Sequence, residues 1–128
     1  MSDWNDRRDE MLGEVYAKVP DAGCKGLCQD QCTSIAGSRR EAQRMAEAGF
    51  PIPTTARPTL REYNRTGVAE PCAALGADGR CQAYEIRPLI CRLWGSVQGL
   101  PCPHGCRPEG GLMPDSEASQ LIRRAKRI

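Results

Sequence analysis

Eight cysteines in a chain of 128 residues constrain this sequence more than any other feature. They fall into three groups: Cys24, Cys28 and Cys32, then Cys72, Cys81 and Cys91, and finally Cys102 and Cys106. An even number of cysteines in a small protein is typical of disulfides or of metal sites, and the redox compartment decides between them. The N-terminal residues are charged and contain no apolar run of signal-peptide length, so we expect a cytoplasmic, reducing environment. Thiolates that bind metal are therefore favoured over disulfides.

Large apolar side chains are scarce in this chain. It has one Phe, two Trp and three Tyr, whereas thirteen Gly and ten Pro interrupt regular structure. Ordering the backbone costs roughly 1–2 kcal/mol per residue, while a structural zinc site contributes on the order of 10 kcal/mol to folding. We therefore expect one small cysteine-rich domain over residues 1–128, mostly α with irregular loops, whose fold is stabilised by metal.

The charge balance gives little support to nucleic-acid binding. The formal net charge of +2 counts thiols as neutral, and eight thiolates with two divalent ions would make the balance negative. The only local basic run lies at residues 123–128, which leaves a protein or nucleic-acid adaptor as an alternative function. No segment reaches transmembrane length, so we expect a soluble protein without a membrane partner.

Two helices are predicted in the first half of the chain. An apolar stripe predicts the first helix, over residues 3–18, and comprises Trp4, Met11, Leu12, Val15 and Tyr16. The second spans Ser38 to Gly49, because Ser38 and Glu41 have the spacing of a capping box. Gly49 stands where a C-terminal glycine is favoured.

The middle of the chain is less regular. Prolines predict a loop over residues 50–58, and residues 59–64 fit either a helical turn that begins with a Thr59–Glu62 capping box or an edge strand. Residues 77–79, Ala-Asp-Gly, predict a hairpin-type turn.

Two further helices are predicted in the last third of the chain. Pro88 is expected at the first position of a short helix that carries Cys91 and Trp94 and closes at Gly95. A final helix over residues 115–128 should be capped by Asp115 or Ser116.

The spacing of the cysteines differs from that of common zinc modules. Zinc fingers and ribbons present a C-x2-C pair, whereas Cys24, Cys28 and Cys32, like Cys102 and Cys106, are four residues apart. Iron–sulfur clusters accept more varied spacings. A [4Fe–4S] cluster is therefore favoured, with zinc as the alternative. His104 is the only histidine, and a lone histidine is more often structural than a ligand.

Residues 71–94, PCAALGADGRCQAYEIRPLICRLW, resemble the signature of the YkgJ-type cysteine-cluster family, also called CxxCxxCC. The family's run places a cysteine before a short turn and then reads G-R-C-x-x-Y-E-x-R-P-x-x-C-R. The upstream group departs from the name-giving motif, because it reads CxxxCxxxC with Thr33 where the last cysteine would stand.

The resemblance implies zinc or iron–sulfur binding by a small cysteine-rich domain. It points most directly to Cys81 and Cys91 as ligands, then to Cys72, and more loosely to the two trailing and three upstream cysteines. A related domain occurs in flagellin lysine methylases, which makes a redox or modification role conceivable, but the family has no single reaction to transfer.

Arg87 and Arg92 flank the predicted helix that bears Cys91. A site with four thiolates carries excess negative charge, so both guanidinium groups are candidates to donate hydrogen bonds to sulfur. The alternative is a surface ion pair, which would contribute little to stability. Tyr84 is interpreted as a core aromatic and not as a catalytic hydroxyl, and no nucleophile–base pair or nucleotide-binding motif is found.

Overall fold

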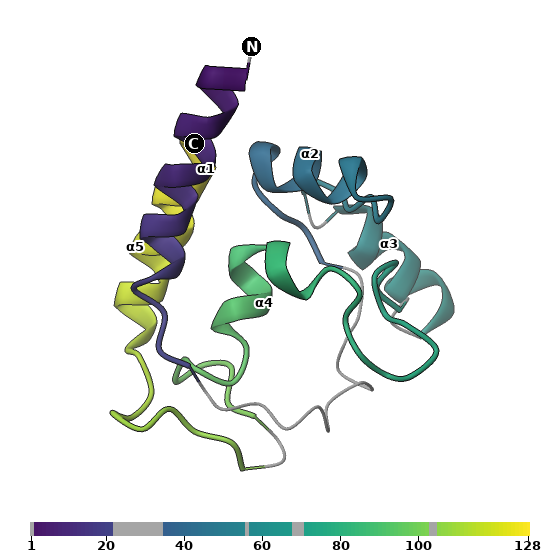
Figure 1. Cartoon of the computed structure of the whole chain (residues 1–128). Coiled ribbons are helices and arrows are strands. Elements are labelled where there is room, and N and C mark those ends of the chain that lie inside the picture. The colour runs from purple at the N-terminus through teal and green to yellow at the C-terminus, as the bar shows by residue number, and fades with distance from the viewer. Residues whose placement is uncertain (1, 22–34, 56, 68–70, 103–104) are drawn as a thin grey trace. The chain divides into compact units, whose positions relative to one another are not determined.

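The computed structural model describes residues 2–21, 35–55, 57–67, 71–102 and 105–128. Its helices are α1 (Ser2–Tyr16), α2 (Arg39–Glu47), α3 (Arg57–Thr66), the 3-10 turn η2 (Tyr84–Ile86), α4 (Leu89–Leu93) and α5 (Asp115–Lys126) (Figure 1). Among the described residues, β pairing is limited to isolated bridges. The prediction of helices joined by irregular loops is therefore confirmed for the described residues.

The chain divides into two compact units. The terminal unit comprises Met1–Lys25 and Leu89–Ile128, and the central unit comprises Gly26–Pro88. No helix in the described part of the chain is long and apolar enough to cross a bilayer.

In the terminal unit, α1 and α5 lie side by side and run in opposite directions (Figure 1). Their apolar faces and α4 enclose one core, made of Leu12, Val15, Leu89, Leu93, Val97, Met113, Ala118, Leu121 and Ala125. Leucine and valine side chains dominate this core, and burial of each stabilises the fold by roughly 1.5–3 kcal/mol. The terminal unit thus has more apolar packing than the composition of the chain suggested.

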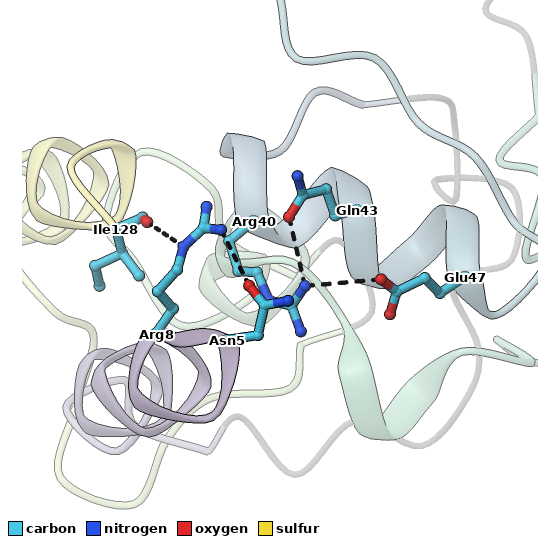
Figure 2. A network of polar contacts seen from close by, with 6 residues as sticks. All are labelled: Asn5, Arg8, Arg40, Gln43, Glu47 and Ile128. Carbon is cyan, nitrogen blue, oxygen red and sulfur yellow. Dashed lines mark hydrogen bonds and ion pairs between the residues drawn. The ribbon is translucent and has the colours of Figure 1, made fainter. Parts of the chain in front are cut away.

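The apolar stripe predicted for the first helix is only partly buried. Leu12 and Val15 are fully buried, but Trp4 is 65% exposed and Met11 is 38% exposed. The stripe is interrupted at Arg8, which donates from Nε to the carbonyl oxygen of Ile128 (2.7 Å) and from Nη1 to Asn5 Oδ1 (3.3 Å) (Figure 2). The first helix is therefore buried at Leu12 and Val15 and not at Trp4.

The N-terminus of α5 is built differently from the predicted cap. Pro114 occupies the cap position, and no side chain caps the helix there. Asp115 instead accepts a hydrogen bond on Oδ1 from the backbone N–H of Gly99 (2.7 Å). A Cβ atom at Gly99 would lie 2.9 Å from that same oxygen, so a side chain there would displace the carboxylate from this position. The carboxylate that was expected to cap α5 is used to hold a loop of the terminal unit.

In the central unit, α2 begins with the predicted capping box. The Ser38 hydroxyl accepts from Glu41 N–H (3.4 Å), and Glu41 Oε1 accepts from Ser38 N–H (3.0 Å). Gly49 has a φ of +93°, the left-handed conformation expected after a helix. Arg40 is nearly buried and lies 3.4 Å from Gln43 Oε1 and 3.8 Å from Glu47 Oε1 (Figure 2).

The ambiguous segment 59–64 is helical, as part of α3. Because α3 begins at Arg57, Thr59 lies inside the helix and is not its cap. The loop predicted over residues 50–58 therefore extends too far, because residues 57 and 58 belong to the helix. Pro58 lies in the first turn of α3, where its missing N–H costs nothing.

The core of the central unit is small. Its buried residues are Met45, Cys72, Ala74 and Ala83, with Phe50, Ile52, Cys81 and Ile86 packed against them. Two of the four buried residues are alanines and one is a cysteine, so little apolar area is removed from water here.

Candidate metal centre

A hydrogen-bonded loop in the central unit brings Cys72 and Cys81 to the same place. The backbone N–H of Leu75 donates to Cys72 (3.0 Å), that of Gln82 donates to Ala74 (2.8 Å), and Leu75 and Cys81 form an antiparallel bridge. This pairing folds the chain back on itself between the two cysteines.

The tip of this loop is the predicted turn. Gly79 N–H donates to Gly76 (3.0 Å), and Gly79 adopts a φ of +80°. Asp78 Oδ1 accepts from Arg80 N–H (3.0 Å), which is typical of an Asp-initiated turn. The sequence prediction is thus confirmed at the residues that position Cys81.

Both cysteines of the loop belong to the core of the central unit. Cys72 is 8% exposed, and Cys81 is partly buried and packs against the same cluster. A long loop therefore places both cysteines in one small core, without the C-x2-C knuckle of zinc fingers. The same pairing could direct two sulfurs towards one metal centre.

In the terminal unit, Cys91 lies on α4, as predicted. Pro88 immediately precedes the helix, and Leu89 and Leu93 bury its apolar side while Cys91 stays partly exposed. The helical pattern continues to Trp94, whose N–H donates to Ile90 (3.2 Å), and ends at Gly95 with a φ of +82°. Because Leu89 and Leu93 pack into the core, the helix turns the face that carries Cys91 away from that core.

The chain turns back directly after α4 and leads to Cys102. Gly95 N–H donates to Leu100 (2.6 Å), and Leu100 N–H donates to Val97 (3.0 Å). Cys102, two residues after Leu100, is only 5% exposed. These bonds place the start of the last cysteine loop at the C-terminal end of α4.

Arg107 holds the loop that ends in Cys106. Its Nη1 donates to the carbonyl oxygens of Cys102 (3.1 Å) and Cys106 (2.8 Å). Gly105 N–H also donates to Cys102 (3.2 Å), with a φ of +88° at Gly105. Sequence reasoning missed Arg107, although its position directly after the last cysteine was a usable signal.

A second contact missed from the sequence ties the N-terminal segment to this region. The Ser96 hydroxyl donates to the carbonyl oxygen of Pro20 (2.7 Å), and Ser96 is almost completely buried. Pro20 precedes the first cysteine of the sequence by four residues. The two partners are 76 residues apart, so no local pattern could have indicated the bond.

Each of the two candidate arginines rests on an aromatic ring. The guanidinium carbon of Arg87 lies 3.8 Å from the centroid of Tyr84, and that of Arg92 lies 3.9 Å from the centroid of Tyr16. Arg87 Nε also donates to the carbonyl oxygen of Tyr84 (3.0 Å). The interpretation of Tyr84 as a core aromatic is wrong, because its side chain is 53% exposed and serves as the platform for Arg87.

The described thiols are distributed over both units. Cys72 and Cys81 lie in the central unit, and Cys91, Cys102 and Cys106 lie in the terminal unit; all five are thiols and not disulfide partners. Within the described residues, no three Cys, His, Asp or Glu side chains form a group that could hold a metal ion. The predicted ligands Cys24, Cys28 and Cys32, and His104, lie outside the described residues.

Comparison with known proteins identifies a family for most of the chain. The family model named CxxCxxCC, described as "Putative zinc- or iron-chelating domain", matches residues 23–119. No curated protein and no solved structure matches the chain. The matched range contains all eight cysteines, both candidate arginines and Arg107. The chain therefore belongs to the CxxCxxCC family of zinc- or iron-chelating domains.

Proposed function

We propose that this protein binds an iron–sulfur centre through its cysteines, with a [4Fe–4S] cluster favoured over zinc. The observation that carries the proposal is the pair of hydrogen-bonded loops, Cys72–Cys81 and Cys102–Cys106, in a chain whose family is described as zinc- or iron-chelating. Neither loop has the C-x2-C geometry preferred by structural zinc, whereas clusters accept cysteines from loops of varied length.

The donor set fits such a centre chemically. Thiolate sulfur is the ligand of iron–sulfur clusters and of closed zinc sites, and the five described cysteines are thiols. The proposed ligands are the described cysteines together with Cys24, Cys28 and Cys32. A bound cluster would supply one-electron transfer or a structural cross-link, which agrees with a redox or modification-related role in a reducing compartment such as the cytoplasm.

Residues of the chain itself prepare the ligands. Arg107 donates to the carbonyl oxygens of both Cys102 and Cys106, which restrains the backbone at these two cysteines. Cys72 and Cys102 are buried, which excludes water from at least part of their surroundings. Arg87 and Arg92 are held at their guanidinium groups by aromatic rings, and we propose that they offset the negative charge of the thiolates.

Anaerobic purification of the whole chain tests the metal. We expect a brown protein with a broad visible absorption band, and with iron and acid-labile sulfide in equal amounts. Elemental analysis of the same sample gives the number of ions per chain.

The outcome against iron–sulfur is equally specific. A colourless anaerobic preparation without labile sulfide, holding tightly bound zinc, would assign the structural zinc role instead. A preparation that contains neither metal in stoichiometric amount, under conditions where the chain is folded, would reject metal binding altogether.

A further inference from the structure

Trp94 carries the one buried side-chain nitrogen or oxygen atom that lacks a hydrogen-bond partner in the described part of the chain. This atom is the indole Nε1. An indole N–H can only donate, and buried tryptophans nearly always find an acceptor for it. A buried donor that is left unsatisfied loses its hydrogen bond to water without replacement, which destabilises the folded chain. The position of Trp94 therefore indicates an acceptor that belongs to the functional protein.

The sequence contains a natural comparison for Trp94. Its only other tryptophan, Trp4, is 65% exposed on α1. Water satisfies an exposed indole, so its N–H needs no partner in the protein. The buried donor thus reflects the surroundings of Trp94 and not a general property of tryptophan in this chain.

The surroundings of Trp94 are those of the proposed ligands. Cys91 precedes Trp94 by three residues. The backbone N–H of Trp94 donates to the carbonyl oxygen of Ile90, which continues the helical turn, so the side chains of Cys91 and Trp94 leave neighbouring positions on one side of α4. The bond between Gly95 and Leu100 then brings the chain leading to Cys102 back beside Trp94. Trp94 therefore lies in the chain between the helix that carries Cys91 and the segment that leads to Cys102.

Sulfur is the acceptor that fits this position. A thiolate bound to metal keeps lone pairs that accept hydrogen bonds, and such bonds lower the charge on sulfur and tune the centre. A buried donor that finds no acceptor, on a residue three positions after Cys91, is the arrangement expected if a metal-bound sulfur serves as its acceptor.

We infer that the indole N–H of Trp94 donates a hydrogen bond to a sulfur of the metal centre that includes Cys91. Trp94 is then a positioning residue that stabilises the bound thiolate, without being a ligand. This inference rests on the proposed metal binding by Cys91.

Replacement of the indole tests the inference. Trp94→Phe removes the N–H, and substitution of Trp94 by 3-benzothienylalanine removes it while retaining the shape of the ring system. We expect both variants to bind metal but to lose it to excess chelator about tenfold faster than the wild type. This is the lower end of the range observed when a residue that hydrogen-bonds to a metal ligand is replaced. Trp4→Phe is the matched control and should release metal at the wild-type rate.

The outcomes separate this inference from the proposal on which it rests. If the anaerobically purified wild-type protein contains no metal, the proposed metal binding is itself contradicted. Metal-loaded wild type, with a benzothienylalanine variant that releases metal at the wild-type rate, overturns the role of the N–H even if Trp94→Phe is faster, because ring packing would then explain the difference. If Trp94→Phe fails to fold, the benzothienylalanine variant decides alone, since it keeps the volume of the side chain.

Discussion

Each of the two units of this protein is stabilised internally in a different way. The terminal unit buries Leu12, Val15, Leu89 and Leu93 in a continuous apolar core between α1, α4 and α5. In the described part of the central unit, the buried apolar cluster contains one large side chain, Met45, with two alanines and Cys72. Hydrophobic stabilisation scales with the apolar area removed from water, so it must be much smaller in the central unit.

The central unit compensates with local hydrogen bonds. The capping box of α2 and the paired loop between Cys72 and Cys81 fix backbone conformation over short distances. Each such bond contributes only about 0.5–1.5 kcal/mol net. A metal centre that cross-links this unit would therefore add a larger fraction of its stability than it adds to the terminal unit.

Removal of the metal should produce the largest effect, and it should destabilise the central unit much more than the terminal unit. We expect the amides of α2 and of the 72–82 loop to exchange hydrogen rapidly in the metal-free protein, because their core is too small to persist alone. Amides of α1 and α5 should keep most of their protection. Hydrogen exchange measured by mass spectrometry, with and without metal, compares the two units directly.

Equal loss of protection in both units would show that the apolar core of the terminal unit is insufficient by itself. Unchanged protection in both would contradict any structural role for metal.

Substitution of one cysteine in each unit should give the next largest effect. Cys81→Ser and Cys91→Ser should each lower the metal content by at least one site, because a serine hydroxyl is a much poorer ligand than a thiolate. Elemental analysis after anaerobic purification measures this loss. Ala73→Ser is the control, since it adds a hydroxyl to the same loop at an exposed position and leaves every thiol in place.

Full metal content in the Cys81 variant alone would restrict the centre to cysteines outside the 72–82 loop. Full content in both variants would reject the assignment drawn from the family signature.

Features with short sequence separation were predictable, and those with long separation were not. The Ser38–Glu41 capping box and the turn at Gly79 depend on residues within three positions of each other, and the structure contains both. The hydrogen bond that interrupts the apolar stripe joins Arg8 instead to Ile128, 120 positions away in the chain. No periodicity within the first helix contains that information.

The same distinction applies to the candidate site. Cys72, Cys81 and Cys91 lie in one contiguous signature, so the sequence indicated them together. The Ser96–Pro20 bond joins residues far apart in the chain and could not be foreseen. Asp115 was assigned to a cap because it precedes a helix, but a distant backbone N–H competes for the same carboxylate.

The stability cost of truncating one core side chain should depend on metal in the central unit and not in the terminal unit. Leu93→Ala and Met45→Ala each empty a fully buried position, at a cost of about 2–5 kcal/mol when the surrounding core is formed. The cost of Leu93→Ala should be similar with and without metal. Met45→Ala should be costly only in the metal-bound protein, and denaturant unfolding under both conditions measures the difference.

A metal-independent cost for Met45→Ala would mean that the central unit folds without its metal. A cost for Leu93→Ala that disappears with the metal would mean that the terminal unit does not.

Each unit also uses one glycine with positive φ in a cysteine loop, and these glycines allow a smaller test. Gly79→Ala and Gly105→Ala should each destabilise by about 1–2 kcal/mol, because a Cβ disfavours the left-handed conformation. Denaturation midpoints of the metal-bound proteins report the loss. Gly110→Ala is a suitable control, because its Cβ would meet open space and its φ is not positive. An unchanged midpoint for Gly79→Ala would indicate that the 72–82 loop adopts another conformation in the loaded protein.

The smallest predicted effect is a gain in stability, confined to the terminal unit. Gly13 lies within α1 at an exposed position, and a Cβ there would meet no atom within 4 Å. Alanine is favoured over glycine in a helix interior by roughly 1 kcal/mol, because glycine loses more backbone entropy on folding. Gly13→Ala should therefore raise the unfolding midpoint of metal-free protein by an amount close to its effect in the metal-bound protein. If the gain appeared only with metal bound, α1 would depend on the metal centre, and the division of the molecule into an apolar unit and a metal-dependent unit would be wrong.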